Sequence, residues 1–330
     1  ELINEALDED VPSRSPERLY EATRYLLKAG GKRLRPTVAL LTAESLADIS
    51  THELNYRSFP ALDGSEIDVM SAATAIEVIQ SFTLIHDDIM DEDDLRRGVP
   101  AVHQQYDTET AILAGDTLYA KAFELMSSTG ADPANGTKAV HRLATTCTKI
   151  CEGQALDVEF ERQQEVLPVE YLEMVELKTA VLYGAAAATT AMLMDASDKT
   201  IQAMYRYGID AGCAFQIQDD VLDLTVPSEE LGKQRGSDLV ENKETLITLH
   251  ARKHGTDVDA LVPDTRVSEV SEEDIDAAVE SLRSTGSITY ASEKATELVE
   301  NAKGHLTVLP DNKPRSLLAD IADFFITRRY

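Results

Sequence analysis

Hydrophobic residues recur three and four positions apart along most of this chain, which is the spacing of helices that pack by one face. The stretch after Glu66 shows this clearly, with apolar side chains at Val69, Ala73, Ile76 and Ile79. Runs that alternate apolar and polar residues, as half-buried strands do, are nearly absent. The pattern therefore predicts an all-α protein built as a large helical bundle.

Turn and capping residues mark where these helices begin and end. Residues 15–17 read Ser-Pro-Glu, an N-cap followed by proline in the first turn, and the helix that they open ends at the glycine pair 30–31. Another helix covers residues 36–47, whereas residues 48–65 lack periodicity and predict a loop or a short broken helix. The later expected helices cover residues 110–127, 136–162, 168–194, 199–224, 243–253, 272–284, 288–306 and 315–327.

The breaks near residues 130–136 and 227–236 have ordinary loop length, and no internal repeat is visible. A single domain over residues 1–330 is therefore expected. Hydrophobic residues make up 43% of the chain and aromatic residues only 5%, with no Trp. Aliphatic side chains must fill its core, which suits a helix-rich interior.

The chain is strongly acidic, because 59 Asp and Glu residues against 31 Lys and Arg residues give a formal net charge of −28. Such a surface repels nucleic acid and anionic membranes, so neither is expected as a partner. Repulsion among the acidic side chains is screened in molar salt, where the Debye length falls to about 3 Å. We therefore expect a halophilic protein; an ordinary acidic cytosolic protein is the alternative.

The cysteines and the apolar runs bear on location. Cys147, Cys151 and Cys213 form no metal-type repeat, and no secretory signal or membrane-spanning run is visible. A cytoplasmic protein without stable membrane insertion is expected. Cys147 and Cys151 lie four apart on one helical face, as a ligand pair or, as we favour, as buried thiols.

Two Asp-Asp-x-x-Asp motifs, at residues 87–91 and 219–223, stand in apolar helices. In each motif the first and last carboxylates lie one turn apart on one face and can hold a cation between them. Solvated acidic faces are the alternative, but carboxylates beside apolar residues cost free energy unless cations neutralise them. Carboxylate oxygens suit Mg²⁺, which completes its shell with water and phosphate oxygens.

The second motif is extended on its own face by Gln216, three residues before Asp219. We expect the two carboxylate clusters to face each other across a helical cavity and to clamp one polyanion through several ions. A diphosphate clamped in this way becomes a better leaving group, because the metals stabilise the charge that develops on it.

Clusters of Lys and Arg stand out in so acidic a chain. Residues 30–36 read Gly-Gly-Lys-Arg-Leu-Arg-Pro and place basic side chains and free backbone N–H groups at the start of a helix, where an anion is favoured. Residues 96–97 are two arginines, and Lys178, Lys233 and Lys243 add further donors. Each alone is compatible with a solvated surface charge, but together they predict binding sites for phosphate groups.

These residues together resemble the trans-isoprenyl diphosphate synthases, the family of farnesyl and geranylgeranyl diphosphate synthases. The matching motifs stand in the family order at residues 30–36, 84–98, 115–116, 153–157, 178–179, 215–220 and 232–243. The resemblance implies the isoprenoid synthase fold around a central cavity, usually in a homodimer. It also implies that three Mg²⁺ ions hold the allylic diphosphate between the two aspartate motifs.

The resemblance further implies three groups of site residues. The metal ligands would be Asp87, Asp91 and Asp219, supported by Asp88, Asp157, Asp220 and Asp223. The contacts to the allylic diphosphate would be Arg96, Lys178, Thr179, Gln216, Lys233 and Lys243. Isopentenyl diphosphate would be bound by Lys32, Arg35 and Arg97, and by Gln80 where many members have His. Gln80 can still donate a hydrogen bond, although it carries no charge.

The implied reaction is ionisation of the allylic C–O bond, attack by the isopentenyl double bond, and loss of a proton. His86 is either a general base or, as we favour, a positioned histidine. A terpene synthase of the same fold is a competing interpretation, but such enzymes typically pair one acidic motif with a different second motif. A silent partner subunit or a cation-binding scaffold is an alternative from another class.

Product length is expected to depend on the side chains that precede Asp87, because each helical turn adds about 5.4 Å to an apolar tunnel. Helix geometry names Thr83 and Ile79, which share the face of Asp87. The resemblance instead names Phe82 as the floor. A small Thr83 beside a bulky Phe82 resembles the archaeal geranylgeranyl type, so a C20 product is expected, with C15 and C25 as alternatives.

Overall fold

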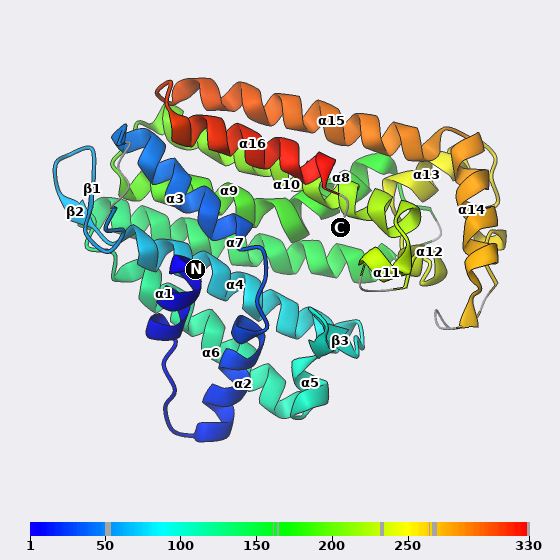
Figure 1. Ribbon diagram of the computed structural model, residues 1–330, viewed down its shortest axis with the longest axis horizontal. Coiled ribbons are helices and arrows are strands. Elements are labelled where there is room, and N and C mark those ends of the chain that lie inside the picture. Colours follow the sequence, from blue (N-terminus) through cyan, green and yellow to red (C-terminus); the bar gives the residue numbers. More distant parts are fainter. Residues whose placement is uncertain are drawn as a thin grey trace. The chain divides into compact units, whose positions relative to one another are not determined.

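Helices form almost all of the regular structure in the computed structural model of this protein (Figure 1). The structure describes residues 1–49, 54–160, 162–163, 165–231, 234–263, 265 and 269–328. Its contacts divide the chain into two units. Unit 1 contains Glu1–Cys147, Ala185–Tyr205 and Thr307–Leu318, and unit 2 contains Thr148–Gly184, Arg206–Leu306 and Ala319–Tyr330. The expected single domain stays a prediction.

Most helices belong to one unit. Those of unit 1 are α1 (Leu2–Asp10), α2 (Glu17–Lys28), α3 (Leu34–Ala47), α4 (Val69–Met90), α5 (Val102–Gln105) and α6 (Thr108–Ser127). Those of unit 2 are α8 (Pro168–Val175), α11 (Ser228–Leu231), α12 (Ser237–Val240), α13 (Leu246–Lys253), α14 (Glu272–Ser284) and α15 (Ser287–His305). The helices with residues in both units are α7 (Pro133–Phe160), α9 (Val181–Leu193), α10 (Asp198–Thr225) and α16 (Lys313–Thr327).

The all-α prediction is confirmed, and the short strands lie in hairpins. Strand β1 (Phe59–Pro60) lies inside the stretch that was expected to be a loop or a broken helix, and it pairs with β2 (Glu66–Ile67), which directly follows that stretch. Strand β3 (Leu95–Arg96) pairs with β4 (Val99–Pro100) directly after the first acidic motif. The sequence pattern predicts neither hairpin, because two-residue strands are too short to show alternation.

Three further differences concern two helices and a cysteine. The helix expected over residues 168–194 is interrupted by a π-helical turn at Glu176–Ala180. The helix expected from residue 243 begins at Leu246, because the Thr245 side chain accepts a hydrogen bond from the Thr248 N–H and caps it. Of the two cysteines expected to be buried, Cys147 is buried but Cys151 is exposed; Cys213 is also buried.

Helix α4 forms the core of unit 1, where it lies beside α6 and α3 (Figure 1). Its side chains Val69, Ala73, Ile76 and Ile79 are completely buried. Burying each large aliphatic side chain contributes about 1.5–3 kcal/mol, so α4 is a main source of stability for this unit. In the described part of the chain it is also the one helix long and apolar enough to cross a membrane, but 72% of its most apolar window is buried inside the structure.

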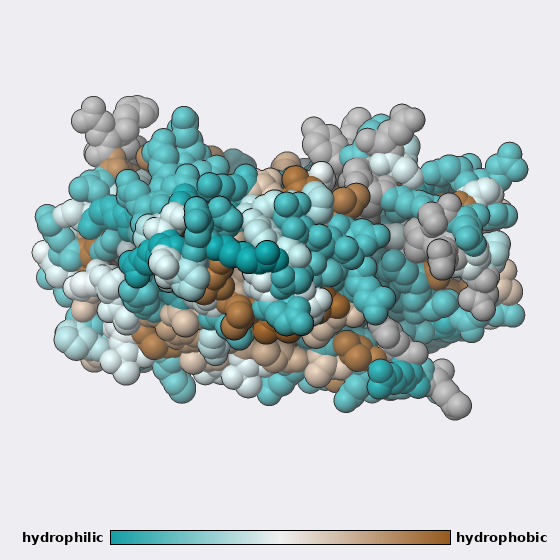
Figure 2. Space-filling view, turned by 90° about the horizontal axis from the view of Figure 1, so that it is seen from below, coloured by the Kyte–Doolittle hydropathy of each residue, from teal (hydrophilic) through white to brown (hydrophobic). Residues whose placement is uncertain are grey.

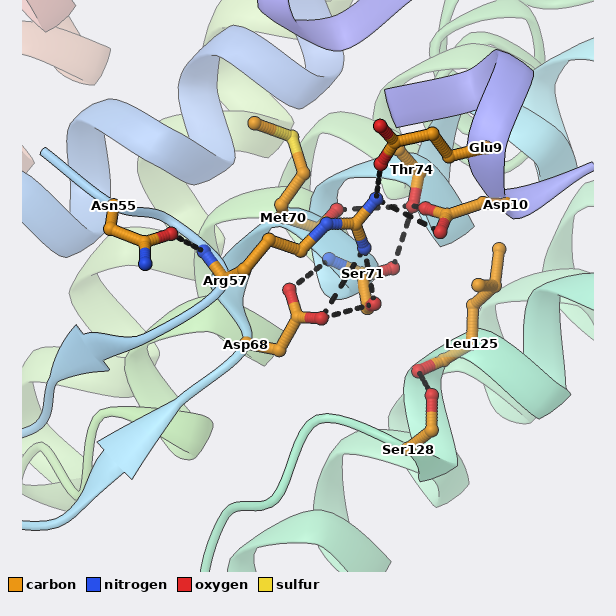
Figure 3. Close-up of polar contacts among 10 residues, drawn as sticks. All are labelled: Glu9, Asp10, Asn55, Arg57, Asp68, Met70, Ser71, Thr74, Leu125 and Ser128. Atoms are coloured by element: carbon orange, nitrogen blue, oxygen red, sulfur yellow. Dashed lines mark hydrogen bonds and ion pairs between the residues drawn. The ribbon is translucent and has the colours of Figure 1, made fainter. Parts of the chain in front are cut away.

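A polar network ties the N-terminal helix α1 to the beginning of α4 (Figure 3). The guanidinium of Arg57 lies 2.9 Å from Asp10 at the end of α1 and 3.3 Å from Asp68. Asp68 caps α4 by accepting the Ser71 N–H at 2.8 Å, and Thr74 donates to Asp10 at 2.7 Å. The helix cap and the attachment of α1 therefore share one network, which fixes the N-terminal end of the helix that carries the first acidic motif.

In unit 2, glycines allow helix backbones to approach closely. A Cβ on Gly208 of α10 would lie 2.4 Å from the backbone N of Gly184, and one on Gly212 would lie 2.7 Å from the Cα of Ala180. Helix α10 can therefore lie directly against the π-turn and the residues that follow it.

Most of the surface seen from below is hydrophilic, with hydrophobic side chains grouped in patches (Figure 2).

Candidate active site

The first acidic motif occupies the C-terminal end of α4. Asp87 and Asp88 lie in the last turn, and Asp91 is the C-cap residue. Asp88 is completely buried, and its Oδ1 accepts hydrogen bonds from the Arg96 guanidinium at 2.5 and 2.6 Å. Burial raises the pKa of Asp88, and the charge of Arg96 opposes this rise. Arg96 also lies 2.8 Å from Asp93, so the arginine joins the motif to the acidic turn that follows it.

The β3–β4 hairpin directs two consecutive arginines to different places. Its two-residue loop, Arg97 and Gly98, has positive φ at both positions (55° and 77°), as a tight turn of the primed type requires. Arg96, at the end of β3, reaches Asp88, whereas Arg97, in the turn, reaches the 30–31 loop. Arg97 donates to the carbonyl oxygens of Gly30 and, at 3.3 Å, Leu26.

The glycine pair of the basic motif makes room for this arginine. Gly31 has a φ of 137°, and a Cβ there would lie 3.0 Å from the Cζ of Arg97. Burial lowers the pKa of Arg97; the negative charge of Glu77 opposes this, and the positive charges of Arg33, Arg96 and Arg35 add to it. Several guanidinium groups thus lie near one another at this loop, which favours an anion with more than one negative charge.

Glu77 is a site residue that sequence reasoning missed. It is 3% exposed, forms an ion pair with the buried Arg33, and lies 3.7 Å from the Arg97 guanidinium. Arg33 also donates to the Leu27 carbonyl at 2.6 Å. A Glu in an apolar stretch of α4 was the available signal, because buried carboxylates are nearly always paired. Arg33 is therefore a structural member of the basic motif.

The other residues expected to bind isopentenyl diphosphate also lie in unit 1. Lys32 is exposed at the loop, and Arg35 is half-buried in the first turn of α3. Gln80 is half-buried on α4, one turn after Glu77. The structure thus brings Arg97 to the loop that carries Lys32, as the sequence predicts for one pocket.

The second acidic motif lies near the end of α10 in unit 2, and each of its aspartates has a different partner. Asp219 forms an ion pair with Arg328, which also stacks on the Phe215 ring at 3.9 Å. Asp220 is buried and accepts hydrogen bonds from the Tyr171 hydroxyl and, at 3.1 Å, from Gln216.

Asp223, the third aspartate of this motif, is also buried, with a relative exposure of 1%. It accepts a hydrogen bond from the Ser237 hydroxyl at 3.0 Å, and its backbone carbonyl accepts the Gly236 N–H at 2.8 Å. Asp223 thus holds the segment that leads into α12. The position of this segment follows from the last carboxylate of the motif.

Asp220 differs from the others in its electrostatics. Burial raises its pKa well above the usual value, and the negative charge of Asp238 adds to this; the hydrogen bonds from Tyr171 and Gln216 oppose the rise. The described chain provides it with neutral donors and no direct ion pair. A cation that binds nearby stabilises a carboxylate in this environment.

The π-turn positions the other residues expected at the allylic diphosphate. Lys178 and Thr179 lie within it, and such turns often occur at functional sites. Lys178 Nζ is 2.5 Å from Asp157 on α7, and the Thr179 hydroxyl donates to Gln216 at 3.1 Å. A Cβ on Gly153 of α7 would lie 2.3 Å from the Lys178 N, so this glycine permits the close approach of the two backbones.

These side chains line a pocket of about 130 Å³ within unit 2. Its lining comprises Asp157, Tyr171, Met174, Val175, Lys178, Thr179, Gln216, Asp220, Asp238, Lys243, Glu244 and Thr245. Lys243 lies 2.9 Å from Glu241. Lys233 falls outside the described residues. The structure therefore brings together two of the predicted metal ligands, Asp157 and Asp220, with four of the predicted diphosphate contacts.

The donor set fits Mg²⁺, although in the described part of the chain no three His, Cys, Asp or Glu side chains are already gathered as a metal site. Proteins usually hold Mg²⁺ through one or two carboxylates together with substrate phosphate oxygens. Asp88 Oδ2 is buried without a hydrogen-bond partner among the described residues, and the side chain of Asp219 is 40% exposed. The carboxylates therefore suit a cation that arrives with phosphate ligands.

The residues expected to limit product length lie on different faces of α4. Ile79 is completely buried, and Thr83 is 9% exposed and donates to the Gln80 carbonyl at 2.9 Å. Phe82 is half-buried and contacts the rings of His86 and, on α6, Tyr119. His86 Nε2 lies 3.3 Å from the Ile112 carbonyl oxygen, in the geometry of a positioned side chain.

Sequence reasoning also missed Tyr171 and Arg328. Tyr171 lies 49 residues before Asp220 and Arg328 lies 109 residues after Asp219, so no local pattern links them to the motif. A tyrosine in the apolar face of α8 was a weak signal, since a buried hydroxyl usually has a partner. For Arg328 the sequence offers no signal.

Comparisons with known proteins point to one family. The polyprenyl synthetase family model matches residues 16–282. A geranylfarnesyl diphosphate synthase from Natronomonas pharaonis is 63% identical over 330 residues, which cover 100% of this chain and 96% of that protein.

Two solved structures have the same fold. A geranylgeranyl pyrophosphate synthetase from Geoglobus acetivorans has a TM-score of 0.87 and 42% identity over 99% of this chain and 97% of its own. A polyprenyl synthase from Caulobacter crescentus, complexed with calcium and isoprenyl diphosphate, has a TM-score of 0.82 and 31% identity over 99% of this chain and 94% of its own.

Proposed function

Since this chain belongs to the polyprenyl synthetase family, we propose that it is a Mg²⁺-dependent prenyltransferase that condenses isopentenyl diphosphate with allylic diphosphates. The family match supports transfer of prenyl groups, and the short-chain relatives support a short-chain product. The observation that carries the proposal is the combination of two acidic motifs with two separate groups of cationic side chains. A reaction between two diphosphates requires such a combination, because each substrate brings its own negative charge.

Two groups of side chains serve the allylic substrate in this proposal. In unit 2, the diphosphate is held by Lys178, Thr179, Gln216 and Lys243. The cations there are held by Asp157, Asp219, Asp220 and Asp223. In unit 1, Asp87, Asp88 and Asp91 hold cations and Arg96 contacts the diphosphate. The bound Mg²⁺ ions supply charge that stabilises the departing diphosphate. The C. crescentus polyprenyl synthase, which is complexed with calcium and isoprenyl diphosphate, supports a divalent cation and a prenyl diphosphate as the ligands.

The basic loop serves the second substrate. Lys32, Arg35 and Arg97 bind isopentenyl diphosphate, and Gln80 donates a hydrogen bond to it. Glu77 orients the Arg97 guanidinium and keeps the arginine cluster together. When the allylic C–O bond breaks, the isopentenyl double bond attacks the cation, a C–C bond forms, and a proton leaves to the released diphosphate. The reaction requires no protein nucleophile.

Two observations point to different product lengths. Phe82 beside the small Thr83 supports a C20 product, geranylgeranyl diphosphate. The N. pharaonis relative supports a C25 product as the second candidate, because it is named a geranylfarnesyl diphosphate synthase and is 63% identical over the whole chain. The proposal further includes a cytoplasmic location, a homodimer and adaptation to high salt. Of these three, the strong net negative charge supports only the adaptation to salt.

An elongation assay tests the proposal. The purified protein is incubated in high salt with Mg²⁺, labelled isopentenyl diphosphate and, in turn, dimethylallyl, geranyl, farnesyl and geranylgeranyl diphosphates. We expect label to enter longer prenyl chains with Mg²⁺ and not with excess EDTA. Extension of geranylgeranyl diphosphate indicates the C25 product, extension of farnesyl but not geranylgeranyl diphosphate indicates C20, and extension of neither indicates C15. Failure to elongate every primer would contradict the proposed function, and a cyclised hydrocarbon product would indicate a terpene synthase.

A further inference from the structure

A second pocket, of about 340 Å³, lies in unit 1, where the first half of α7, the end of α9 and the start of α10 line it. We call it the α7–α10 pocket. Its volume is in the range of sites that bind small molecules. None of the side chains assigned above to the two diphosphates or to the cations is part of its lining. A ligand in this pocket would therefore be independent of the proposed function.

Helix α7 provides a cationic wall for the α7–α10 pocket. Four residues of this helix line it, namely Lys138, His141, Arg142 and Thr145. Their spacing of three and four residues places them on one face of the helix. Lys138 and His141 are exposed, and Arg142 is half-buried. The wall therefore offers ammonium, imidazole, guanidinium and hydroxyl groups, all of which can donate hydrogen bonds to an anion.

The two permanent cations of this wall are not neutralised by acidic neighbours. In the part of the chain that the structure describes, neither Lys138 nor Arg142 forms an ion pair. This is unusual in a chain with 59 acidic residues against 31 basic ones. Asp198 is the acidic residue of the lining, and it lies in the first turn of α10, where the helix dipole favours a carboxylate. Two positive charges against one negative charge thus favour an anion in this pocket.

Arg142 is positioned by an aromatic ring. Its Cζ lies 4.8 Å from the centroid of the Tyr205 ring, and Tyr205 is only 8% exposed. A cation over such a ring gains about 0.5–2 kcal/mol, which restricts the guanidinium to one place. Contact with the ring uses no N–H group in a hydrogen bond to a carboxylate. The donors of Arg142 therefore stay available for an oxyanion, which arginine can bind through two parallel hydrogen bonds.

The buried part of the lining is apolar. Met192 of α9 is 7% exposed and Ile201 of α10 is 6% exposed, and both line the pocket. An inorganic anion would use only the cationic wall. An organic anion would also remove apolar surface from water, which contributes about 25 cal/mol for each Å² that is buried. The lining therefore fits an anion that carries an apolar group.

We propose that the α7–α10 pocket is a binding site for an organic phosphate with a short apolar body. Lys138 and Arg142 bind the phosphate group, and Met192 and Ile201 contact the apolar body. A phosphate monoester carries about 1.5 to 2 negative charges at pH 7, which matches the two cations better than the single charge of a carboxylate does.

Methyl NMR with hexyl phosphate as the probe tests the inference. The full chain, with ¹³C-labelled methionine methyl groups, is titrated in EDTA with hexyl phosphate, with inorganic phosphate and with hexanol. Met192→Leu assigns the Met192 signal. We expect hexyl phosphate to shift this signal at concentrations at least about tenfold lower than either fragment requires, because charge and apolar area both contribute to binding. An unmoved Met192 signal, or equally tight binding of hexanol, would overturn the proposed site.

Variants that remove one charge distinguish a built site from general attraction. Lys138→Gln and Arg142→Gln should each weaken hexyl phosphate binding at the Met192 signal by about tenfold, since each removes a charged donor. Lys199→Gln is the matched control, because Lys199 is exposed in the first turn of α10, next to Asp198, but does not line the pocket. Its affinity should equal the parent's. An equal loss in all three variants would contradict a specific site.

Chemical modification of the unaltered chain provides a second measurement. Lysine side chains are reductively methylated with and without hexyl phosphate, and mass spectrometry gives the extent of modification at each lysine. We expect the probe to protect Lys138 and to leave Lys199 as reactive as before. If Lys138 reacts equally at a probe concentration that saturates the shift of the Met192 signal, its assignment to the phosphate group is wrong.

Discussion

Asp88 and Asp220 hold the same position in the two acidic motifs, yet their surroundings differ. Both are buried, and burial raises the pKa of each. Asp88 is paired with the guanidinium of Arg96, whereas Asp220 receives hydrogen bonds from the neutral groups of Tyr171 and Gln216. The Asp88 carboxylate therefore already has a positive partner, whereas the hydrogen-bond donors to Asp220 are neutral.

Motif spacing therefore specifies where the carboxylates lie, but not which charged groups neutralise them. The first motif contains the ion pair between Asp88 and Arg96. This pair maintains the stability of the fold, because removing either partner leaves a buried charge. In the second motif, burial of the Asp220 carboxylate lowers the stability of the fold, and a bound cation would offset that cost. The first motif should therefore respond to mutation mainly through stability, and the second mainly through metal binding.

The largest expected effect is that of Arg96→Ala, which leaves Asp88 buried without its partner. We expect a loss of about 3 kcal/mol in unfolding free energy, measured by denaturant unfolding without metal. Arg96→Lys should lose less, because it keeps the charge but not the bidentate geometry. The pKa of Asp88 should rise further in Arg96→Ala, so stability falls as pH rises and the loss should be larger at pH 8 than at pH 5. Equal losses at both values would contradict a role for the charge.

The next prediction compares the two aspartates directly. Asp88→Asn should lower the unfolding free energy by about 2 kcal/mol, since Arg96 loses its charged partner. Asp220→Asn should raise it by about 1 kcal/mol in metal-free buffer, because a neutral amide avoids the cost that raises the pKa of Asp220. Melting temperatures of the two variants provide the measurement. Shifts of the same sign would break the comparison.

A smaller effect is expected for Tyr171→Phe, which keeps the buried ring and removes the hydroxyl donor to Asp220. We expect about tenfold weaker Mg²⁺ binding, as is typical when a group that orients a metal ligand is lost. The readout is the Mg²⁺ concentration needed to raise the melting temperature in the presence of inorganic diphosphate. Tyr207→Phe is the control, since Tyr207 is as deeply buried on α10, more than three turns before Asp220. An equal loss in both variants would remove the specific role of Tyr171.

The sequence predicts the helical fold and the two acidic motifs, because both depend on short spacings along one helix. Local patterns carry the information in both cases. The grouping of Arg97 with Lys32 came from the family resemblance, and its structural basis is a two-residue turn at Arg97 and Gly98 that the hydrophobic pattern does not reveal.

The missed features all depend on long-range packing. Glu77 pairs with Arg33 across 44 residues, and Tyr171 reaches Asp220 across 49. Gly153 of α7 permits the close approach of the π-turn at Lys178. A single sequence signals at most that a buried Glu77 or Tyr171 needs a partner, because the tertiary fold decides which distant side chains meet.

The central claim is that both acidic motifs bind the cations that prenyl transfer requires. Its most direct test is isopentenyl incorporation by the parent, Asp87→Asn and Asp219→Asn, measured at saturating allylic primer over a range of Mg²⁺ concentrations. We expect the parent to require Mg²⁺, and we expect each variant to keep its fold by circular dichroism but to lose at least about a hundredfold in rate, because a stabiliser of transition-state charge is removed. A variant of either motif that incorporates isopentenyl units at the parent's rate and with the parent's Mg²⁺ dependence would contradict it.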